Sequence, residues 1–340
     1  MIMIDEFITK MPKVELHVHL EGSVKPATLL KLAKNHKIKL PANDIAGLQK
    51  WYSFRDFNHF IEIYMTISSC LQTKEDIELI TREFIANQAQ QNIIYSEVTF
   101  TPYNQYLNNK LGFHEQMDAV NRAREWGEKT YGFRMGIIVD IPRFISTKEG
   151  DKIANWVVER YGDGIIALGL GGPEMGNPPQ KFESAFTRVG KEGIPCVLHA
   201  GETVGAESIW NAIKIADTYR IGHGVRAIED PGLMDYLRDK QIPLEVCPSS
   251  NICLKVYPSF EEHSLPQLLE HGLYITINSD DPPMFNTTLT NEYLIGRKFW
   301  GWDRERIIGF ILNAVDASLL SIIEKKRMRF EFERLFNKMN

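Results

Sequence analysis

The chain has 340 residues, of which 44% are hydrophobic and 24% are charged, and these proportions exclude a disordered or low-complexity protein. Its 39 basic and 44 acidic side chains give a net charge of −5, so the basic excess typical of nucleic-acid-binding proteins is missing. No apolar run approaches the roughly 18 residues that cross a bilayer, and the first residues do not resemble a signal peptide. We therefore expect a cytoplasmic protein with reduced cysteines that binds neither nucleic acid nor a membrane.

Eight short apolar runs alternate along the chain with amphipathic helical stretches. Such runs are typical of parallel strands that are buried on both faces. They lie at residues 14–20, 93–100, 134–140, 165–170, 195–200, 220–223, 242–246 and 274–279. Because no linker or repeat divides the chain, we predict one α/β domain over residues 1–340, a (β/α)8 TIM-type barrel with additional C-terminal helices. A doubly wound sheet is disfavoured, because Glu174 stands where a dinucleotide fingerprint would have its third glycine.

The interval between the first and second predicted strands is much longer than any later one. These strands begin at residues 14 and 93, which leaves approximately residues 25–92 for a helical insertion on the catalytic face of the barrel. Within the insertion, Phe57 and Phe60 belong to an apolar stripe with helical spacing. Such a stripe usually packs into a core; the alternative is a lid whose phenylalanines contact the substrate.

Polar side chains interrupt the apolar strands at their C-terminal ends. His17 and His19 are two residues apart and therefore face the same side of the first strand. The fifth, sixth and eighth predicted strands end near His199, His223 and Asp280. In a barrel these ends meet on one face, and three imidazoles with a carboxylate suit Zn²⁺, with Fe²⁺, Co²⁺ and Mn²⁺ as alternatives. A cation of this kind makes water nucleophilic at neutral pH.

Hydrolytic attack also requires an acid and a base, and two titratable groups on this face are not needed as ligands. Glu202 and His223 are therefore the candidates for these roles. The other histidines lie in helical or loop stretches, where we expect surface or capping roles: His36, His59, His114, His263 and His271.

Four motifs follow one another along the chain: His17-Val18-His19-Leu20-Glu21-Gly22, His199-Ala200-Gly201-Glu202, Gly222-His223-Gly224 and Asn278-Ser279-Asp280-Asp281-Pro282. In this order, and over nearly the whole chain, they resemble the adenosine/adenine deaminase family of the amidohydrolase superfamily. The resemblance implies the barrel fold and a hydrolase that converts the 6-amino group of an adenine-containing small molecule, adenosine first, to a 6-oxo group with release of ammonia.

The resemblance also implies a role for each motif residue. The implied ligands of one zinc ion per chain are His17, His19, His199 and Asp280. The implied catalytic groups are Glu202 as proton donor to N1 of the purine, His223 as the group that deprotonates or orients the attacking water, and Asp280 as a further contact of that water. The implied substrate contacts are Asp281 at N7, the Gly172 N–H at N3, Glu21 near the sugar, and His19; Phe57 and Phe60 of the insertion are the further candidate contacts.

Several alternatives remain open. Glu21 and Pro173 stand where nucleoside-specific members usually carry Asp, so adenine, N6-substituted adenines and aminodeoxyfutalosine are alternative substrates. A binuclear amidohydrolase is disfavoured because the fourth predicted strand ends without a lysine. A cytidine-type deaminase is disfavoured because Cys247-Pro248 is not followed by its cysteine pair. A non-enzymatic purine-binding barrel is the remote alternative, and the sequence does not reveal the oligomeric state.

Overall fold

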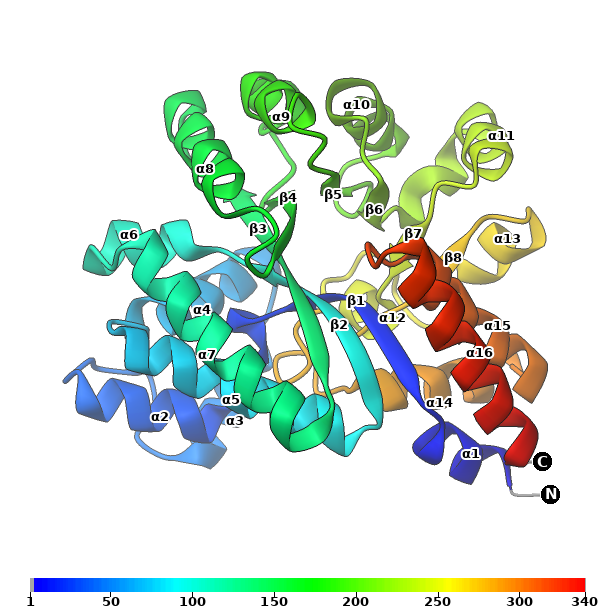
Figure 1. The fold of residues 1–340 in the computed structure, drawn as a ribbon, viewed down its shortest axis with the longest axis horizontal. Coiled ribbons are helices and arrows are strands. Elements are labelled where there is room, and N and C mark those ends of the chain that lie inside the picture. Colours follow the sequence, from blue (N-terminus) through cyan, green and yellow to red (C-terminus); the bar gives the residue numbers. More distant parts are fainter. Residues whose placement is uncertain (1–2, 340) are drawn as a thin grey trace.

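The computed structural model describes residues 3–339, and its centre is a barrel of eight parallel strands (Figure 1). Each strand pairs with the next one in chain order. The strands are β1 (Lys13–His19), β2 (Ile93–Phe100), β3 (Arg134–Pro142), β4 (Ile165–Gly171), β5 (Cys196–Ala200), β6 (Arg220–His223), β7 (Leu244–Val246) and β8 (Ile275–Ile277). The (β/α)8 barrel predicted from the apolar runs is thus confirmed.

A side chain and two backbone hydrogen bonds close the barrel between β8 and β1. Oδ1 of Asn278 accepts hydrogen bonds from the backbone N–H groups of Leu16 (2.9 Å) and His17 (3.1 Å). The N–H of His19 donates to the carbonyl oxygen of Asp280 (2.9 Å), and the N–H of Asp280 donates to that of His17 (3.1 Å). The closure therefore fixes the backbone of three predicted metal ligands relative to one another.

Helices between and after the strands surround the barrel (Figure 1). They are α5 (Lys74–Gln90), α7 (Phe113–Tyr131), α8 (Thr147–Arg160), η2 (Pro179–Phe182), α9 (Glu183–Gly190), α10 (Ala206–Ala216), η3 (Val225–Glu229), α11 (Pro231–Lys240), α13 (Leu265–Glu270) and α15 (Arg304–Ala317). α15 contacts both β8 and β1 and so covers the closure, while α16 (Ile322–Lys338) packs on α15 and α1 (Ile4–Lys10) packs on α14 (Leu289–Trp300). Among the described residues, no helix has the length and apolar character needed to cross a membrane.

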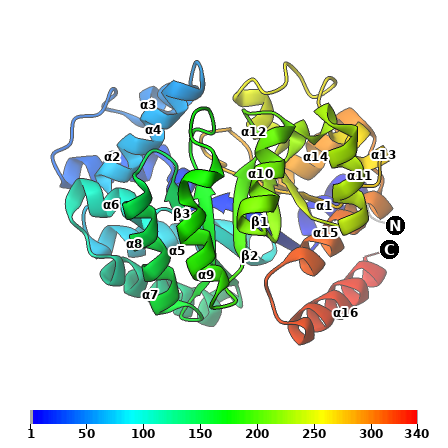
Figure 2. The same cartoon turned by 90° about the horizontal axis from the view of Figure 1, so that it is seen from above.

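The segment between β1 and β2 contains the predicted helical insertion. It consists of η1 (Glu21–Ser23), α2 (Pro26–Asn35), α3 (Ile45–Tyr52) and α4 (Phe57–Cys70). α5 packs against α7 and β2 and therefore belongs to the ring around the barrel rather than to the insertion. α3 and α4 lie at one end of the barrel, as does α12 (Pro248–Cys253) (Figure 2). α4 also contacts α6 (Pro102–Asn109), which follows β2, so the insertion is packed against the loops at the C-terminal ends of the strands.

The observed strands differ from the predicted ones at a few ends, for identifiable reasons. β5 begins after Pro195 and β7 begins after Pro243, because proline has no N–H to donate to a neighbouring strand. β8 ends before Asn278, whose side chain takes over the bonding to β1. His263 is buried, contrary to a surface position, but its Nδ1 accepts a hydrogen bond from the N–H of Leu265 (3.0 Å) at the start of α13, which is a capping role.

Candidate active site

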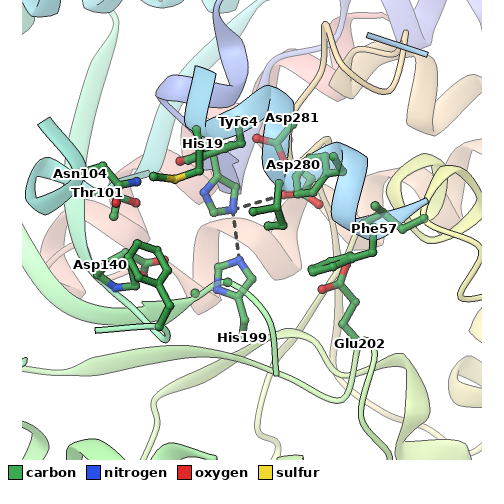
Figure 3. A pocket seen from close by; sticks show the side chains of 18 of the residues that line it. His19, Phe57, Tyr64, Thr101, Asn104, Asp140, His199, Glu202, Asp280 and Asp281 are labelled. Carbon is green, nitrogen blue, oxygen red and sulfur yellow. Dashed lines mark hydrogen bonds and ion pairs between the residues drawn. The ribbon is translucent and has the colours of Figure 1, made fainter. Parts of the chain in front are cut away.

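The C-terminal ends of the strands open into a pocket whose lining combines apolar, aromatic and polar side chains, as is typical of small-molecule sites. Phe57, Phe60 and Tyr64 of α4 contribute to its lining, so the insertion covers the strand ends (Figure 3). The polar lining from the barrel includes residues that the sequence motifs singled out: His19, His199, Glu202, His223, Asp280 and Asp281. The fold thus brings side chains from distant parts of the chain into one cavity.

The four predicted ligands lie close together beside this cavity. Oδ1 of Asp280 lies 3.5 Å from Nε2 of His17 and 3.3 Å from Nε2 of His19. Nε2 of His19 lies 3.1 Å from Nε2 of His199. Tetrahedral ligand atoms at about 2.0–2.1 Å from zinc are about 3.3–3.4 Å apart, so each of these three pairs is spaced like two ligands of one zinc ion. Nε2 of His17 is buried without a hydrogen-bond partner among residues 3–339, as expected of a nitrogen that binds a cation.

Hydrogen bonds from behind orient two of these imidazoles. Nδ1 of His17 donates to Oε2 of Glu245 (2.8 Å), and Nδ1 of His199 donates to the carbonyl oxygen of Leu170 (3.0 Å). Each bond places a proton on Nδ1, so Nε2 faces the cluster and offers its lone pair when the ring is neutral. Oε1 of Glu245 accepts a hydrogen bond from Nε of Arg220 (2.5 Å), so a buried ion pair holds the carboxylate in place.

The electrostatic environment of the cluster favours a cation. Burial lowers the pKa of His17, but Asp280 and Glu245 outweigh this effect and raise the pKa to about 10. Burial opposes ionisation of Asp280, yet His17 and His19 hold its pKa well below the usual range. Burial lowers the pKa of His199, which is therefore a neutral imidazole with a free lone pair. The cluster thus combines the negative charge of Asp280 with the neutral nitrogen donor of His199.

Glu202 and His223 lie close together in the pocket with perturbed proton affinities. Oε1 of Glu202 is 3.6 Å from Nε2 of His223. Burial, together with the charges of Asp280 and Glu174, raises the pKa of Glu202 well above its usual range. Burial lowers the pKa of His223 to about 4. Burial therefore favours the protonated form of the Glu202 carboxyl group, which suits an acid, and the uncharged form of the His223 imidazole.

A chain of hydrogen bonds determines which nitrogen of His223 carries the proton. The N–H of Leu265 donates to Nδ1 of His263, so the proton of this neutral ring is on Nε2. Nε2 of His263 donates to Oδ1 of Asn251 (3.1 Å), and Nδ2 of Asn251 lies 3.5 Å from Nδ1 of His223. The amide therefore donates to Nδ1 of His223, and the Nε2–H of His223 faces the pocket.

Two further arrangements support the motif residues. Glu174 accepts hydrogen bonds from the backbone N–H groups of Gly201 (3.0 Å) and Glu202 (2.9 Å), and thereby fixes the loop that carries the acid. Gly22 makes room for the buried carboxylate of Asp281, because a Cβ at residue 22 would overlap it. Oδ1 of Asp281 has no hydrogen-bond partner within the described part of the chain and is available to a ligand.

Two motif residues adopt a backbone conformation that is rare for non-glycine residues. His223 has a φ of 62° and Asp280 has a φ of 64°. Such left-handed conformations cost free energy and persist where the surrounding structure enforces them, which is common at functional sites. Gly172 also has a positive φ, of 93°, and lines the pocket as predicted for a backbone group that approaches a ligand.

Glu21 lies beside the pocket rather than in its lining. Its buried carboxylate accepts hydrogen bonds from the N–H of Thr101 (3.0 Å), Nε2 of Gln105 (3.3 Å) and the hydroxyl of Tyr64 (3.2 Å). The direct sugar contact expected of Glu21 has no counterpart in this geometry, because its oxygens face these protein donors. Instead Glu21 positions Tyr64 and Thr101, which do line the pocket.

Several residues of the site were missed by the sequence analysis. Thr101, Asn104 and Asp140 line the pocket, while Glu245 and Arg220 support the ligand cluster from behind. A signal for Asp140 was present, because it ends the third predicted strand with a carboxylate, as His199 nearly ends the fifth with an imidazole. The others carry no comparable signal, since their roles depend on pairings between distant strands and loops.

Comparisons with known proteins agree with this geometry. The sequence model of the family described as Adenosine deaminase matches residues 12–334. An aminodeoxyfutalosine deaminase of Streptomyces avermitilis is 36% identical over 96% of this chain and 92% of its own. An adenine deaminase of Pseudomonas fluorescens is 36% identical over 93% of this chain and 99% of its own.

A solved structure shares the fold. It is an amidohydrolase from Burkhoderia ambifaria with bound Zn, which superimposes with a TM-score of 0.92 over 98% of this chain and 93% of its own at 21% identity. The match of the family model to nearly the whole chain, and relatives above 30% identity along its length, agree with the motifs and the barrel. The chain therefore belongs to the adenosine deaminase family.

Proposed function

We propose that this protein is a zinc-dependent hydrolytic deaminase that replaces the 6-amino group of an adenine-containing compound by a 6-oxo group and releases ammonia. The observation that carries the proposal is the position of the Glu202 carboxyl group, whose pKa is raised by burial, beside a cluster of three imidazoles and one carboxylate. As a member of the adenosine deaminase family, the chain is a hydrolase that acts on C–N bonds in cyclic amidines.

The residues present fit a single divalent metal ion. His17, His19 and His199 would supply nitrogen ligands and Asp280 an oxygen ligand, and three pairs of these donor atoms lie 3.1–3.5 Å apart. Such a donor set suits Zn²⁺, and water would bind as a further ligand beside the four side chains. When bound, the ion would supply Lewis-acid chemistry that makes water a nucleophile at neutral pH.

Glu202 acts as the acid in the proposed reaction. Its raised pKa favours the protonated carboxyl group, which donates to N1 of the purine and makes C6 more electrophilic. The electrons of the C6–N1 bond then move to the protonated ring nitrogen as water adds to C6. Asp281, with one unpartnered oxygen, accepts a hydrogen bond from the N7 side of the ring when N7 carries a proton, or donates to N7 when the carboxyl itself does.

His223 and Asp280 handle the attacking water. The Nε2–H of His223 faces the pocket, so His223 orients the water as a hydrogen-bond donor rather than removing its proton. Oδ2 of Asp280, the oxygen directed towards His223 at 3.9 Å, accepts the proton of the water. That proton passes to the departing amino group. Ammonia then leaves, the C6 hydroxyl gives its remaining proton to the Glu202 carboxylate, and the C6–O bond becomes the double bond of the 6-oxo product.

Adenine and its neutral nucleoside derivatives are the proposed substrates. The curated relatives act, by their names, on adenine or on aminodeoxyfutalosine, and adenosine was the first expectation from the motifs. The test is ammonia release from adenine, adenosine, 2′-deoxyadenosine, N6-methyladenine and aminodeoxyfutalosine, with the zinc content measured in the same preparation. We expect one zinc per chain and turnover of at least one compound; zinc-loaded protein that releases ammonia from none of them would refute the proposal.

The Glu202→Gln variant tests the role of the acid independently of metal binding. We expect kcat to fall by about 10²- to 10⁴-fold with the zinc content unchanged, because Glu202 contacts His223 rather than the ligand cluster. Glu207→Gln is the matched control, since Glu207 is exposed on α10, and it should retain wild-type kcat. Equal activity of both variants would remove Glu202 from the reaction.

A further inference from the structure

Asp140 presents to the pocket a carboxyl group that no other described residue hydrogen-bonds. It lies near the end of β3, is only 3% exposed and belongs to the pocket lining. Its Oδ1 has no hydrogen-bond partner among residues 3–339. Buried polar atoms are rarely left in this state, and a ligand is one physical reason for it.

Two glycines of the neighbouring strand make room for this carboxyl group. Asp140 pairs with Gly169 of β4 in the sheet, and Gly171 lies two residues further along. A Cβ at Gly169 would overlap Oδ1 of Asp140, and a Cβ at Gly171 would overlap Oδ2. The Gly169-Leu170-Gly171 pattern therefore allows the carboxyl group to lean over β4, and any side chain at either position would displace it.

Asn104 adds a second acceptor on the same side. It belongs to α6, is 2% exposed, and its Oδ1 also has no hydrogen-bond partner in the described residues. Figure 3 shows Asn104, Thr101 and Asp140 together on one side of His19 and His199, with Glu202 on the other side. The pocket thus has an acid on one side and two free acceptors on the opposite side.

The orientation that the proposed function gives to the purine brings its N9 end to these acceptors. In a purine, N1 and C4 lie across the six-membered ring from each other, and N9 is attached to C4. A ring that receives a proton at N1 from Glu202 therefore directs N9 away from Glu202, towards the side that carries Asp140 and Asn104 (Figure 3).

We propose that Asp140 and Asn104 form the subsite for the N9 end of the substrate, and that this subsite takes a neutral group with a hydrogen-bond donor. The donor is the N9–H of a free base or a hydroxyl of a sugar. The inference rests on the proposed function, because it uses the contact between Glu202 and N1. An acceptor oxygen is available at Asp140 in either protonation state of its carboxyl group.

The charges around the pocket exclude a phosphate from this subsite. None of the described lining residues is a lysine or an arginine, and Asp140 is a carboxyl group. The buried guanidinium of Arg143 donates to the carbonyl oxygens of Asn177 and His199 (both 2.6 Å) and lies outside the lining. A phosphate next to Asp140 would lose its hydration without gaining a positive partner, so nucleotides are poor substrates.

The test compares Asp140→Ala with wild type on adenine, adenosine, 9-methyladenine and AMP. 9-Methyladenine has neither N9–H nor a hydroxyl, so it serves as an internal control for the reaction itself. We expect kcat/KM of Asp140→Ala to fall about 10- to 100-fold for the preferred donor-bearing substrate and less than about threefold for 9-methyladenine. If kcat/KM falls for adenine, the hydrogen-bond donor is N9–H. If it falls for adenosine, the donor is a sugar hydroxyl.

Asp140→Asn and a binding measurement complete the test. Asn retains an acceptor oxygen, so Asp140→Asn should recover part of the loss, and calorimetry with hypoxanthine or inosine should show the same order of affinities without turnover. An equal loss for 9-methyladenine, an unchanged kcat/KM, or a wild-type preference for AMP over adenosine would overturn the inference while the deaminase function stands. Absence of ammonia from every compound would instead overturn the proposed function, and the inference with it.

Discussion

Replacement of Glu245 by glutamine should weaken metal binding by changing the tautomer of His17. In the barrel, one oxygen of Glu245 accepts from Nδ1 of His17 (2.8 Å) and the other accepts from Nε of Arg220 (2.5 Å). Glutamine has a single acceptor oxygen, and the always-charged guanidinium of Arg220 requires it. The amide NH₂ group then faces Nδ1 of His17, so the imidazole proton moves to Nε2, the nitrogen that faces Asp280.

The expected loss of zinc affinity follows from the number of ligands that the substitution affects. One of four ligands must change its tautomer before it can bind, and changes in groups that orient metal ligands typically cost 10- to 100-fold in affinity, or about 1.4–2.8 kcal/mol. The fold itself loses a buried charge partner of Arg220, whose side chain is 0% exposed. We therefore expect weaker zinc binding together with a lower free energy of unfolding.

Glu97→Gln is the matched control. Oε2 of Glu97 accepts from Nη2 of Arg220 (2.5 Å) in the same buried network, but Glu97 contacts none of the predicted metal ligands. Both variants should show a similar loss of stability in urea unfolding, whereas competition with a zinc chelator should reveal weaker binding for Glu245→Gln only. Equal zinc affinities of the two variants would show that the tautomer of His17 does not limit metal binding.

The remaining predictions concern groups that position the reacting side chains. Gly22→Ala should lower kcat/KM at least tenfold with unchanged zinc content, because its Cβ displaces the carboxylate of Asp281; wild-type kinetics would contradict the role of Asp281. Asn251→Asp should move the proton of His223 from Nε2 to Nδ1, which ¹⁵N NMR of the ring reads directly. Burial by itself would raise the pKa of Glu174. Hydrogen bonds from Ser208 and from backbone amides, together with the charge of Arg143, outweigh burial and lower this pKa. Its contribution to stability is therefore complete above about pH 4.5 and is lost as pH falls through the lowered value, and Glu174→Gln should remove this part of the acid destabilisation seen in unfolding curves.

The fold could be predicted because each strand carries its own signal. A strand that is buried on both faces must be apolar along its whole length, and this requirement acts on consecutive residues, so it can be read locally. The ends of the strands were harder to predict where a side chain takes the place of backbone pairing between strands. Asn278 bonds to the backbone of β1 through its amide oxygen, and nothing in the sequence around residue 278 indicates a partner 262 positions away.

The site could be predicted only as far as polar residues stand at strand ends. His199 and Asp280 are conspicuous after apolar runs, and so is Asp140, whose meaning becomes clear only when Gly169 and Gly171 are seen beside it. Glu21 shows the opposite case. It follows the predicted metal ligand His19 in the sequence, but the turn of η1 directs its carboxylate towards donors from Thr101, just after β2, and from α6, and away from the cavity.

Metal binding and substrate recognition involve different parts of the pocket. The groups that would bind the metal lie on or next to β1, β5 and β8, where the closure of the barrel and the Glu245–Arg220 pair hold them rigidly. The unpartnered acceptor of Asn104 lies on α6, which packs against the insertion helix α4. A change of substrate can therefore arise at α6, α4 and the end of β3 without disturbing the ligand shell, which explains physically how relatives that share this barrel can act on different adenine compounds.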